Sequence, residues 1–276
     1  MTVASVEHTG SEVVGAPAQA AIQLEHVSKQ FDGRPVLDDV SIDVPAGTAF
    51  CLLGRSGTGK SVTLKHIIGL MQPDAGRVLV HGVDMASVRG RELARVRRGM
   101  GFLFQNAALF DSISVGENVA FPLRRHTDWA DRRIREVARS KLADVGLEAD
   151  YNKMPADLSG GMRKRVGLAR AIVGQPRVLL YDEPVTGLDP VNSATVARLI
   201  GEIGHRMGVT TVMVTHDVEG ALAVCDRIAL LHDGRLRFVG SPAAFRRSPD
   251  PLVRAFADRE AAGAVSLREL EAMATP

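Results

Sequence analysis

Eight consecutive residues constrain the fold of this chain more than any other stretch. They read G-R-S-G-T-G-K-S and match the phosphate-binding pattern G-x-x-x-x-G-K-[ST] at every fixed position. A short apolar run, 48–53, precedes them, and apolar residues spaced i, i+3, i+4 and i+7 follow them. The eight residues are Gly54, Arg55, Ser56, Gly57, Thr58, Gly59, Lys60 and Ser61, and the apolar ones that follow are Leu64, Ile67, Ile68 and Met71. The stretch therefore lies between an expected strand and an expected helix.

The residue types of this stretch indicate its chemistry. Glycines let the backbone turn tightly so that several N–H groups face one anion, and the helix N-terminus adds partial positive charge there. In this pattern Lys60 reaches the β- and γ-phosphates of a nucleotide, and Ser61 ligates Mg²⁺. A glycine-rich turn that binds nothing is the alternative, which the complete pattern between a strand and a helix disfavours.

Composition limits the class of protein. The 276 residues allow one large or two modest domains, and 45% apolar with 24% charged residues is ordinary for a soluble globular protein. The formal charge is only +2, so we expect no nucleic-acid partner. Cys51 and Cys225 lie in apolar stretches without metal-ligand spacing and are expected to be buried. The chain shows neither a secretory signal nor an apolar run long enough to span a bilayer, which favours a cytoplasmic protein.

Basic residues gather in three places. Five arginines lie in 89–98, seven Lys and Arg residues in 124–141, and three in 163–165. Solvated helix faces are the simpler explanation of such clusters. Contact with a membrane-embedded partner, or with the anionic headgroups around it, is the alternative.

The chain begins with a polar tail, about 1–20, without periodicity, which is typical of disorder. Alternating apolar residues then predict strands over 22–27 and 36–44. Phe31 precedes the turn between these strands and could stack on a nucleobase, although a plain core or surface phenylalanine fits equally well. Further strands are expected at 76–82 and 100–105, and the second of these ends in Gln105.

Two later strands end in polar residues. The run 177–184 ends in Asp182 and Glu183, and the run 210–215 is followed by His216. Open α/β sheets bind ligands at the carboxyl ends of their strands. We therefore expect Asp182 to hold Mg²⁺, Glu183 to polarise the attacking water, and His216 to hydrogen-bond a γ-phosphate. A surface acidic pair is the alternative for the two carboxylates, and short strands at 227–231 and 235–239 follow.

Five elements now stand in one order: the phosphate loop, Gln105, the stretch L-S-G-G-M at 158–162, the Asp182–Glu183 pair and His216. Together they resemble the nucleotide-binding subunit of ATP-binding cassette (ABC) transporters. The resemblance covers about 22–245. It implies an α/β fold with a RecA-like P-loop NTPase core, an antiparallel β subdomain and an inserted α-helical subdomain. The domain limits expected from it are a disordered tail 1–20, an ATPase domain 21–245 with the helical subdomain at about 108–172, and a C-terminal extension 246–276.

The resemblance also implies roles for single residues. Phe31 would stack on adenine, Gln105 would sense both Mg²⁺ and the permease, and Asp189 would belong to the loop that links the two sites of a dimer. The cofactors would be ATP and Mg²⁺, with Lys60, Gln105, Glu183 and His216 catalytic and Ser61, Gln105 and Asp182 at the metal. Ser159, Gly160 and Gly161 would close over the γ-phosphate of the opposite subunit, so that a homodimer sandwiches two ATP molecules.

The stretch L-S-G-G-M-R-K-R-V-G-L-A-R at 158–170 is similar to the ATPases of Mla/Mce lipid-transport systems. That similarity implies a membrane permease, an extracytoplasmic lipid-binding Mce-type protein, and a place at the cytoplasmic face of the inner membrane. Met162 stands where the ABC pattern commonly has glutamine, and we expect activity to survive because Ser159 and the glycine backbone remain.

Three other functions compete with lipid transport. The chain could energise an importer of amino acids, ions or sugars, or act as a non-transport ABC ATPase in DNA repair or on ribosomes. It has one cassette, no long heptad pattern and no zinc cysteines, which disfavours the second of these. A catalytically silent module is disfavoured because Glu183 and His216 are present.

The C-terminal segment is longer than a cassette needs. Ser266 to Glu269 has the S-x-x-E form of a capping box and predicts a short helix. We expect the loop 248–251 to lead the chain away from its own core, so that this helix braces the opposite subunit. Docking on the permease and a frayed tail are the alternatives.

Overall fold

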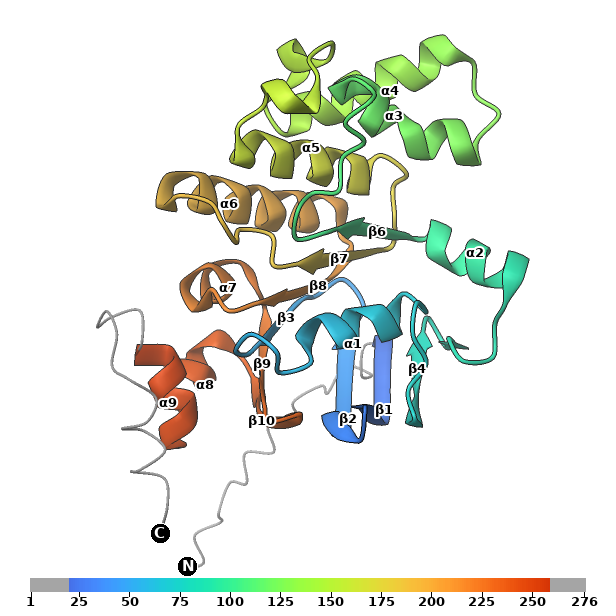
Figure 1. The fold of residues 1–276 in the computed structure, drawn as a ribbon. Helices are drawn as coiled ribbons and strands as arrows, with labels where there is room; N and C mark the ends of the chain where they lie inside the picture. Colours follow the sequence, from blue (N-terminus) through green and yellow to red (C-terminus); the bar gives the residue numbers. More distant parts are fainter. Residues whose placement is uncertain (1–19, 259–276) are drawn as a thin grey trace, which may run out of the picture.

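The structure, a computed structural model, describes residues 20–258, in which the strands form two sheets (Figure 1). The four-stranded sheet has the order β2-β1-β4-β5 and is antiparallel throughout. The six-stranded sheet has the order β10-β9-β3-β8-β7-β6 and is parallel except for the β10–β9 pair. The strand bounds are β1 Ala20–Phe31, β2 Arg34–Pro45, β3 Ala49–Leu53, β4 Ala75–Val80, β5 Val83–Asp84, β6 Met100–Leu103, β7 Val178–Asp182, β8 Thr210–Thr215, β9 Arg227–His232 and β10 Arg235–Gly240.

The middle strands of the six-stranded sheet are apolar because both of their faces are covered. Along β7, Val178 and Leu180 point to one hydrophobic cluster, and Leu179 and Tyr181 point to another. The first cluster lies between the two sheets and includes Leu64 of α1 (Lys60–Ile67). The second is shared with the helices on the opposite face. The phosphate-loop helix is thus held between two sheets.

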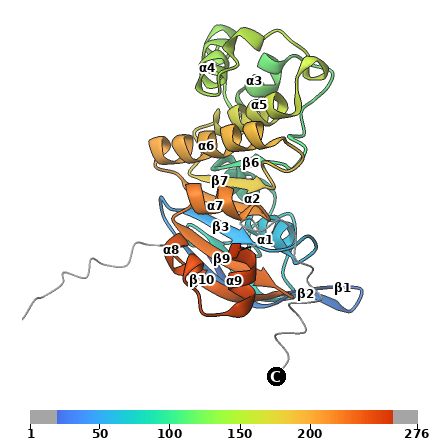
Figure 2. The same cartoon turned by 90° about the vertical axis from the view of Figure 1, so that its left-hand side faces the viewer.

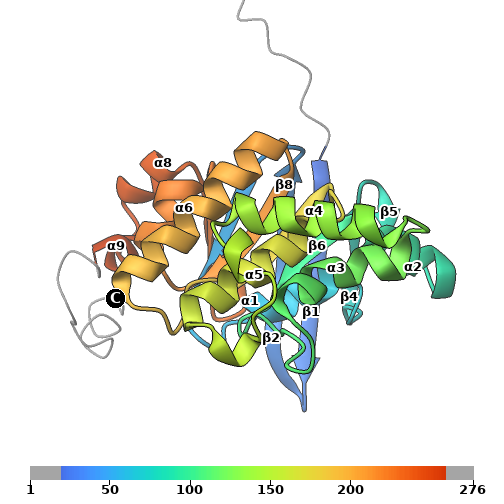
Figure 3. The same ribbon diagram turned by 90° about the horizontal axis from the view of Figure 1, so that it is seen from above.

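Helices cover the remaining face of the large sheet. In Figures 1 and 2, α3, α4 and α5 form one end of the molecule above α6, and β1 and β2 lie at the other end. Figure 3 looks down on α3, α4, α5 and α6, which lie in front of the sheet. The bounds are α2 Gly90–Arg98, α3 Val115–His126, α4 Asp131–Asp144, η1 Glu148–Asp150, η2 Pro155–Asp157, α5 Gly160–Ile172, α6 Pro190–Met207, α7 Val218–Val224, α8 Pro242–Arg246 and α9 Pro251–Asp258. Across 20–258, the helices are too short or too polar to traverse a lipid bilayer.

The expected α/β architecture, with an antiparallel sheet and helical parts, is confirmed. One helix limit differs from expectation. The helix after the phosphate loop stops at Ile67, because Gly69 adopts a left-handed φ of 70°, so Met71 lies outside it. Helix α5 starts at Gly160, because the Ser159 side chain caps it. Cys51 and Cys225 are buried, as expected, and burial raises the pKa of the Cys51 thiol.

The expectation that 248–251 leads the chain away from its core is wrong as far as residue 258. Asp250 accepts a hydrogen bond from the Leu252 backbone N–H at 2.8 Å and starts α9 there. Val253 and Phe256 of α9 then enter the same hydrophobic cluster as Phe245 of α8. Burial of the apolar face of α9 therefore keeps the chain on its own core, although Pro249 and Pro251 favour a turn away from it. The helix expected at 266–269 and the expected tail 1–19 lie outside the described residues.

Candidate active site

The phosphate loop connects β3 to α1 and depends on two glycines at close approaches. Gly59 has φ 101°, and a Cβ there would lie 2.7 Å from the Val36 carbonyl oxygen. A Cβ at Gly54 would lie 2.7 Å from the Leu231 carbonyl oxygen. Real side chains do not tolerate such contacts with backbone atoms. The sequence pattern therefore corresponds to a steric requirement of this loop.

The side chain of Lys60 is buried and hydrogen-bonds to the backbone of the phosphate loop. Its side chain is 5% exposed, and its Nζ donates hydrogen bonds to the carbonyl oxygens of Gly54 at 2.7 Å and Arg55 at 2.9 Å. The same Nζ lies 3.3 Å from Oε1 of Glu183. A buried ammonium is stable only when it is paired and hydrogen-bonded, and both conditions hold here. The ammonium thus links the phosphate loop to the end of β7.

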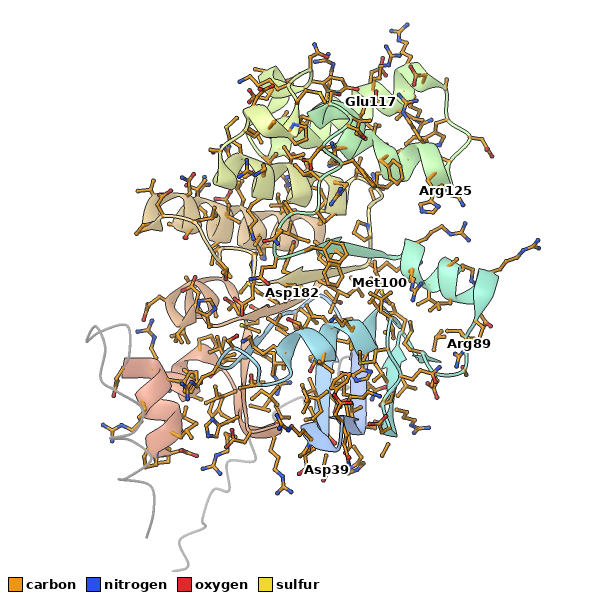
Figure 4. The ribbon with its side chains drawn as sticks, in the orientation of Figure 1. Asp39, Arg89, Met100, Glu117, Arg125 and Asp182 are labelled. Atoms are coloured by element: carbon orange, nitrogen blue, oxygen red, sulfur yellow. The ribbon has the colours of Figure 1, made fainter. Side chains whose placement is uncertain are left out.

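Ser61 and Asp182 form a hydroxyl–carboxylate pair beside this ammonium. The Ser61 hydroxyl donates to Oδ1 of Asp182 at 2.8 Å, although the two residues are 121 positions apart. Hard oxygen donors of these two kinds suit Mg²⁺, which takes few protein ligands together with phosphate oxygens and water. Asp182 lies near the centre of the molecule in Figure 4. The donor set fits the metal that the sequence predicts.

Glu183 occupies a strained position immediately after β7. Its φ is 47°, a left-handed conformation that a non-glycine residue rarely adopts. Its Oε2 accepts a hydrogen bond from Thr186 Oγ1 at 3.0 Å, lies 3.3 Å from Thr215 Oγ1, and lies 2.9 Å from Nδ1 of His216. The carboxylate is therefore held from three sides and aimed across the strand ends.

The charge of Glu183 follows from two opposing effects. Burial alone raises the pKa of its carboxyl, but the Lys60 ammonium and then His216 and the Thr186 hydroxyl outweigh that effect. The pKa of Glu183 therefore lies below the ordinary range of a glutamate. The side chain is an anion at neutral pH.

Lys60, Ser61 and Glu183 line one cavity of about 290 Å³ at the carboxyl ends of β3, β7 and β8, whereas Asp182 lies behind Ser61 and is not part of the lining. The phosphate loop and α1 contribute Lys60 and Ser61, and the segment after β7 contributes Glu183 and Thr186. Gln105 and His216 come from other elements. The full lining of the cavity is Val36, Ser56, Gly57, Gly59, Lys60, Ser61, Val62, Gln105, Glu183, Thr186 and His216. Gly54, Arg55 and Thr58 shape the loop, and Thr58 Oγ1 donates to the Arg55 carbonyl at 2.9 Å. The cavity has the polar donors and the depth that a nucleotide phosphate chain requires.

Phe31 does not line the cavity. It ends β1 with 40% of its surface exposed, and the Lys29 Nζ lies 5.6 Å from the centre of its ring. The ring is thus an accessible aromatic face rather than a core phenylalanine.

Ser159, Gly160, Gly161 and Asp189 also lie apart from the cavity and form a second polar site. Ser159 Oγ accepts from the Met162 N–H at 3.3 Å at the start of α5. A Cβ on Gly161 would lie 2.6 Å from Asn192 Oδ1, and Asn192 Nδ2 donates to Asp189 Oδ2 at 2.5 Å. The start of α5 therefore packs against the start of α6. Met162 packs its side chain against the hydrophobic core.

Sequence reasoning missed Lys164. The sequence favours a solvated triplet at 163–165, yet Lys164 is 5% exposed and donates to the carbonyl oxygens of Gln105 and, at 3.1 Å, Glu183. Burial lowers its pKa, and the nearby Glu183 and Asp182 charges partly offset that effect. The helical spacing of the sequence could have indicated this burial, because Gly161, Lys164 and Leu168 share one buried face of α5 at i, i+3 and i+7.

Comparison with known proteins agrees with this geometry. Residues 37–186 match the family model described as ABC transporter. "Probable ribonucleotide transport ATP-binding protein mkl" of Mycobacterium leprae (strain TN) is 42% identical over 92% of this chain and 73% of that protein. "Intermembrane phospholipid transport system ATP-binding protein MlaF" of Escherichia coli (strain K12) is 38% identical over 90% of this chain and 92% of that protein.

Solved structures show the same relationship. The dimeric, post-hydrolysis ATP-binding cassette MJ0796 with ADP and Pi superposes with a TM-score of 0.74 at 30% identity, covering 80% of this chain and 98% of that chain. The cbiO1 protein of Clostridium perfringens superposes with a TM-score of 0.76 at 25% identity, covering 93% of this chain and 99% of that chain. The chain belongs to the ABC transporter family and is its ATP-binding, ATP-hydrolysing subunit. ATPases of this family work as dimers with a membrane permease.

Proposed function

We propose that the cavity holds the triphosphate of ATP and that Glu183 polarises the attacking water. The argument for this role is the observed arrangement of its carboxylate, which is anionic, held by three neighbours and placed beside Lys60. Lys60 would exchange its contacts with the loop carbonyls for phosphate oxygens. His216 lines the same cavity and would meet the γ-phosphate, while its Nδ1 orients Glu183.

In this proposal Mg²⁺ is bound by Ser61 and Asp182, with Gln105 as the third protein group. The support is the hydroxyl–carboxylate pair described above and the place of Gln105 in the cavity lining. When bound, the ion supplies charge neutralisation of the phosphates. Lys164 would position this group of residues, because one ammonium holds the carbonyls of Gln105 and Glu183 together.

The second polar site is proposed to act on the nucleotide of another copy of this chain. Ser159, Gly160, Gly161 and Asp189 present a helix N-terminus and backbone donors that lie apart from the cavity of their own chain. A second copy placed head to tail would bring these donors to the open γ-phosphate. Phe31, exposed at the end of β1, would stack on the adenine.

We propose that the transported molecule is a phospholipid or another hydrophobic molecule, moved across or from the inner membrane. The support is the 38% identity to MlaF over 92% of its length, a protein whose name states phospholipid transport. A Mce-type lipid-binding protein beyond the membrane would complete the system. The mkl relative, at 42% identity, makes ribonucleotides the second candidate.

The permease contact is proposed for three exposed phenylalanines near Gln105. Phe104, Phe110 and Phe121 are each at least 41% exposed, and the Phe110 and Phe121 rings lie 4.7 Å apart. Large exposed aromatics in one region mark an interaction site. Phe104 precedes Gln105, which lines the cavity, and Phe121 lies on α3, so this region would connect ATP binding to the permease. The chain would then sit peripherally at the cytoplasmic face of the membrane.

The domain limits are part of this proposal. We start the ATPase domain at Ala20, where β1 begins, and keep a helical subdomain at about 108–172. Because α9 shares the core with α8, we extend the ATPase domain from 245 to at least 258. The residues that follow form the C-terminal extension.

Purification of the ATPase–permease complex tests the transport proposal. Mass spectrometry of the complex carrying Glu183→Gln should identify bound phospholipid, and added phospholipid should stimulate ATP hydrolysis by the parent complex. Stimulation by ribonucleotides without bound lipid would favour the second candidate. Stimulation by amino acids, metal ions or sugars would contradict both.

A further inference from the structure

The structure separates the three basic clusters by what their side chains contact. In the cluster on α3 and α4, Arg124 pairs with Glu117 and Asp131, and Arg132 pairs with Glu136. The triplet 163–165 donates to backbone carbonyls. These charges are therefore used within the fold, whereas Arg125 is exposed and makes no ion pair, hydrogen bond or ring contact among residues 20–258.

The cluster 89–98 divides into two groups. Arg89 donates to the carbonyls of Ala86 and Val88, and Arg97 donates to those of Ile68 and Gly69. Both are used within the fold. The other three, Arg91, Arg95 and Arg98, are exposed and form no ion pair, hydrogen bond or ring contact with any residue in 20–258.

These three arginines lie on one face of α2. Their spacing of i, i+4 and i+7 places them in a row about 10 Å long. On the inner side of the helix, Leu93 and Val96 pack against the hydrophobic cluster that contains α1. The arginine face, defined as Arg91, Arg95 and Arg98, is thus held outward by the packing of the opposite side.

The arginines of this face repel one another, because like charges at i, i+3 and i, i+4 are destabilising. The helix dipole disfavours Arg91 in the first turn and favours Arg95 and Arg98 in the last turn. Glu92 is the single acidic residue of α2. Repulsion of this kind is relieved when an anionic partner binds. On a helix face that contacts only water, the repulsion among the three guanidinium groups would remain.

We propose that the arginine face binds the phosphate groups of anionic phospholipids at the membrane surface. Guanidinium groups bind phosphate oxygens in pairs of parallel hydrogen bonds. Figures 1 and 3 place α2 at one edge of the molecule beside the end of α3, and Figure 4 shows Arg125 on the same side. The net charge of +2 makes the row a local feature rather than part of a broadly basic surface. The inference rests on the proposed function in one respect, that the ATPase works beside a membrane.

Flotation with lipid vesicles tests this assignment on the full chain. The parent should bind vesicles of phosphatidylcholine with phosphatidylglycerol, should not bind phosphatidylcholine alone, and should release as salt is added. The triple variant R91Q/R95Q/R98Q should partition about a hundredfold less, at about fivefold for each arginine.

A matched control removes the same charge elsewhere. Exposed Arg247 and Arg254 lie beside α8 and on α9, on the side of the molecule away from α2, and half-buried Arg227 starts β9, near the centre of the molecule; none of the three makes an ion pair among residues 20–258. The variant R227Q/R247Q/R254Q should bind vesicles like the parent. Equal losses in both variants, or parent-like binding by the α2 variant, would overturn the proposal, as would a parent chain that ignores anionic vesicles.

Two further readouts separate the partners. If the α2 variant keeps vesicle binding but loses association with the permease, the partner of the arginine face is an acidic protein segment and the lipid proposal is overturned. ATP hydrolysis in detergent should be unchanged in both variants. If the parent binds vesicles but does not hydrolyse ATP, the proposed function is contradicted. The assignment of the arginine face to anionic phospholipids then still holds.

Discussion

Glu183 has the contacts of a catalytic carboxylate and the strain of a functional position. Its left-handed φ of 47° and its threonine and histidine neighbours aim the carboxylate into the cavity. Sequence alone could place this residue at a strand end, since the apolar run before it is plain. It could not reveal the backbone strain or the partners, because Thr186 and Thr215 come from two separate segments.

Replacing Glu183 by glutamine should separate ATP binding from hydrolysis. The amide keeps the size of the side chain but loses the charge that polarises water, so hydrolysis should fall by about a hundredfold or more while ATP affinity is retained. Equilibrium titration and steady-state kinetics measure the two quantities. Lys60→Ala should instead lose ATP binding, and Glu148→Gln, an exposed control, should match the parent. Normal turnover by Glu183→Gln would refute the assignment.

The lowered pKa of Glu183 predicts how its contribution to stability depends on pH. Because the folded-state pKa lies below the unfolded value of about 4.3, the contribution is fully present above that value. It is lost as the pH falls through the folded-state pKa. Urea unfolding of the parent and of Glu183→Gln at a series of pH values should show a stability difference that is constant near neutrality and shrinks in acid. A difference that grows in acid would contradict the sign of the shift.

Lys164 should act as a positioning residue. Lys164→Met removes the charged donor from two buried carbonyls, so we expect a loss of about 2 kcal/mol in unfolding free energy and a fall of about 4–8 °C in Tm. We also expect kcat to fall while KM for ATP stays near the parent value. Lys153→Met, at an exposed lysine paired with Asp150, is the control. If Lys164→Met is as stable as the parent and has the same kcat, Lys164 is not a positioning residue.

At the scale of elements, the predictions from sequence were good where a strand or helix is set by its own residues. The strands around the phosphate loop, Asp182 and His216 were placed correctly, since each is a short apolar run. Helix α9 was missed because its burial depends on α8 and the large sheet, which no local pattern contains. The start of α5 at Gly160 depends on the Ser159 cap.

One buried side chain holds the second half of the loop between β6 and α3, from Phe110 to Ser114. Asn118 accepts from the Phe110 N–H at 2.8 Å and donates to the carbonyls of Phe110, Ile113 and Ser114. Asn118→Ala should cost about 3 kcal/mol, because it leaves buried backbone groups unpaired, and should weaken permease binding by freeing Phe110. Asn106→Ala, at an exposed asparagine of the same loop, should change neither thermal unfolding nor co-purification. Equal behaviour of the two variants would contradict the role of Asn118.

At the scale of the whole molecule, the proposed function divides the site into two halves. The cavity contains the groups that we propose bind phosphate and activate water, and the start of α5 carries the backbone donors that we propose act on a second copy, apart from this cavity. The sequence predicted both halves through their motifs and through resemblance to ABC transporters. The expectation that the second half acts on the opposite subunit came from the resemblance alone, because the packing that holds α5 and α6 together involves residues distant in sequence, which no local pattern contains.

The central claim is that two copies of this chain close on ATP and that the charge of Glu183 reopens them through hydrolysis. Sedimentation of Glu183→Gln, with and without Mg·ATP, measures this most directly. The account predicts a dimer with nucleotide and a monomer without it, and a monomer in both conditions when Ser159→Arg is added. A Glu183→Gln chain that stays monomeric with saturating Mg·ATP, or a Ser159→Arg variant that dimerises equally well, would contradict it.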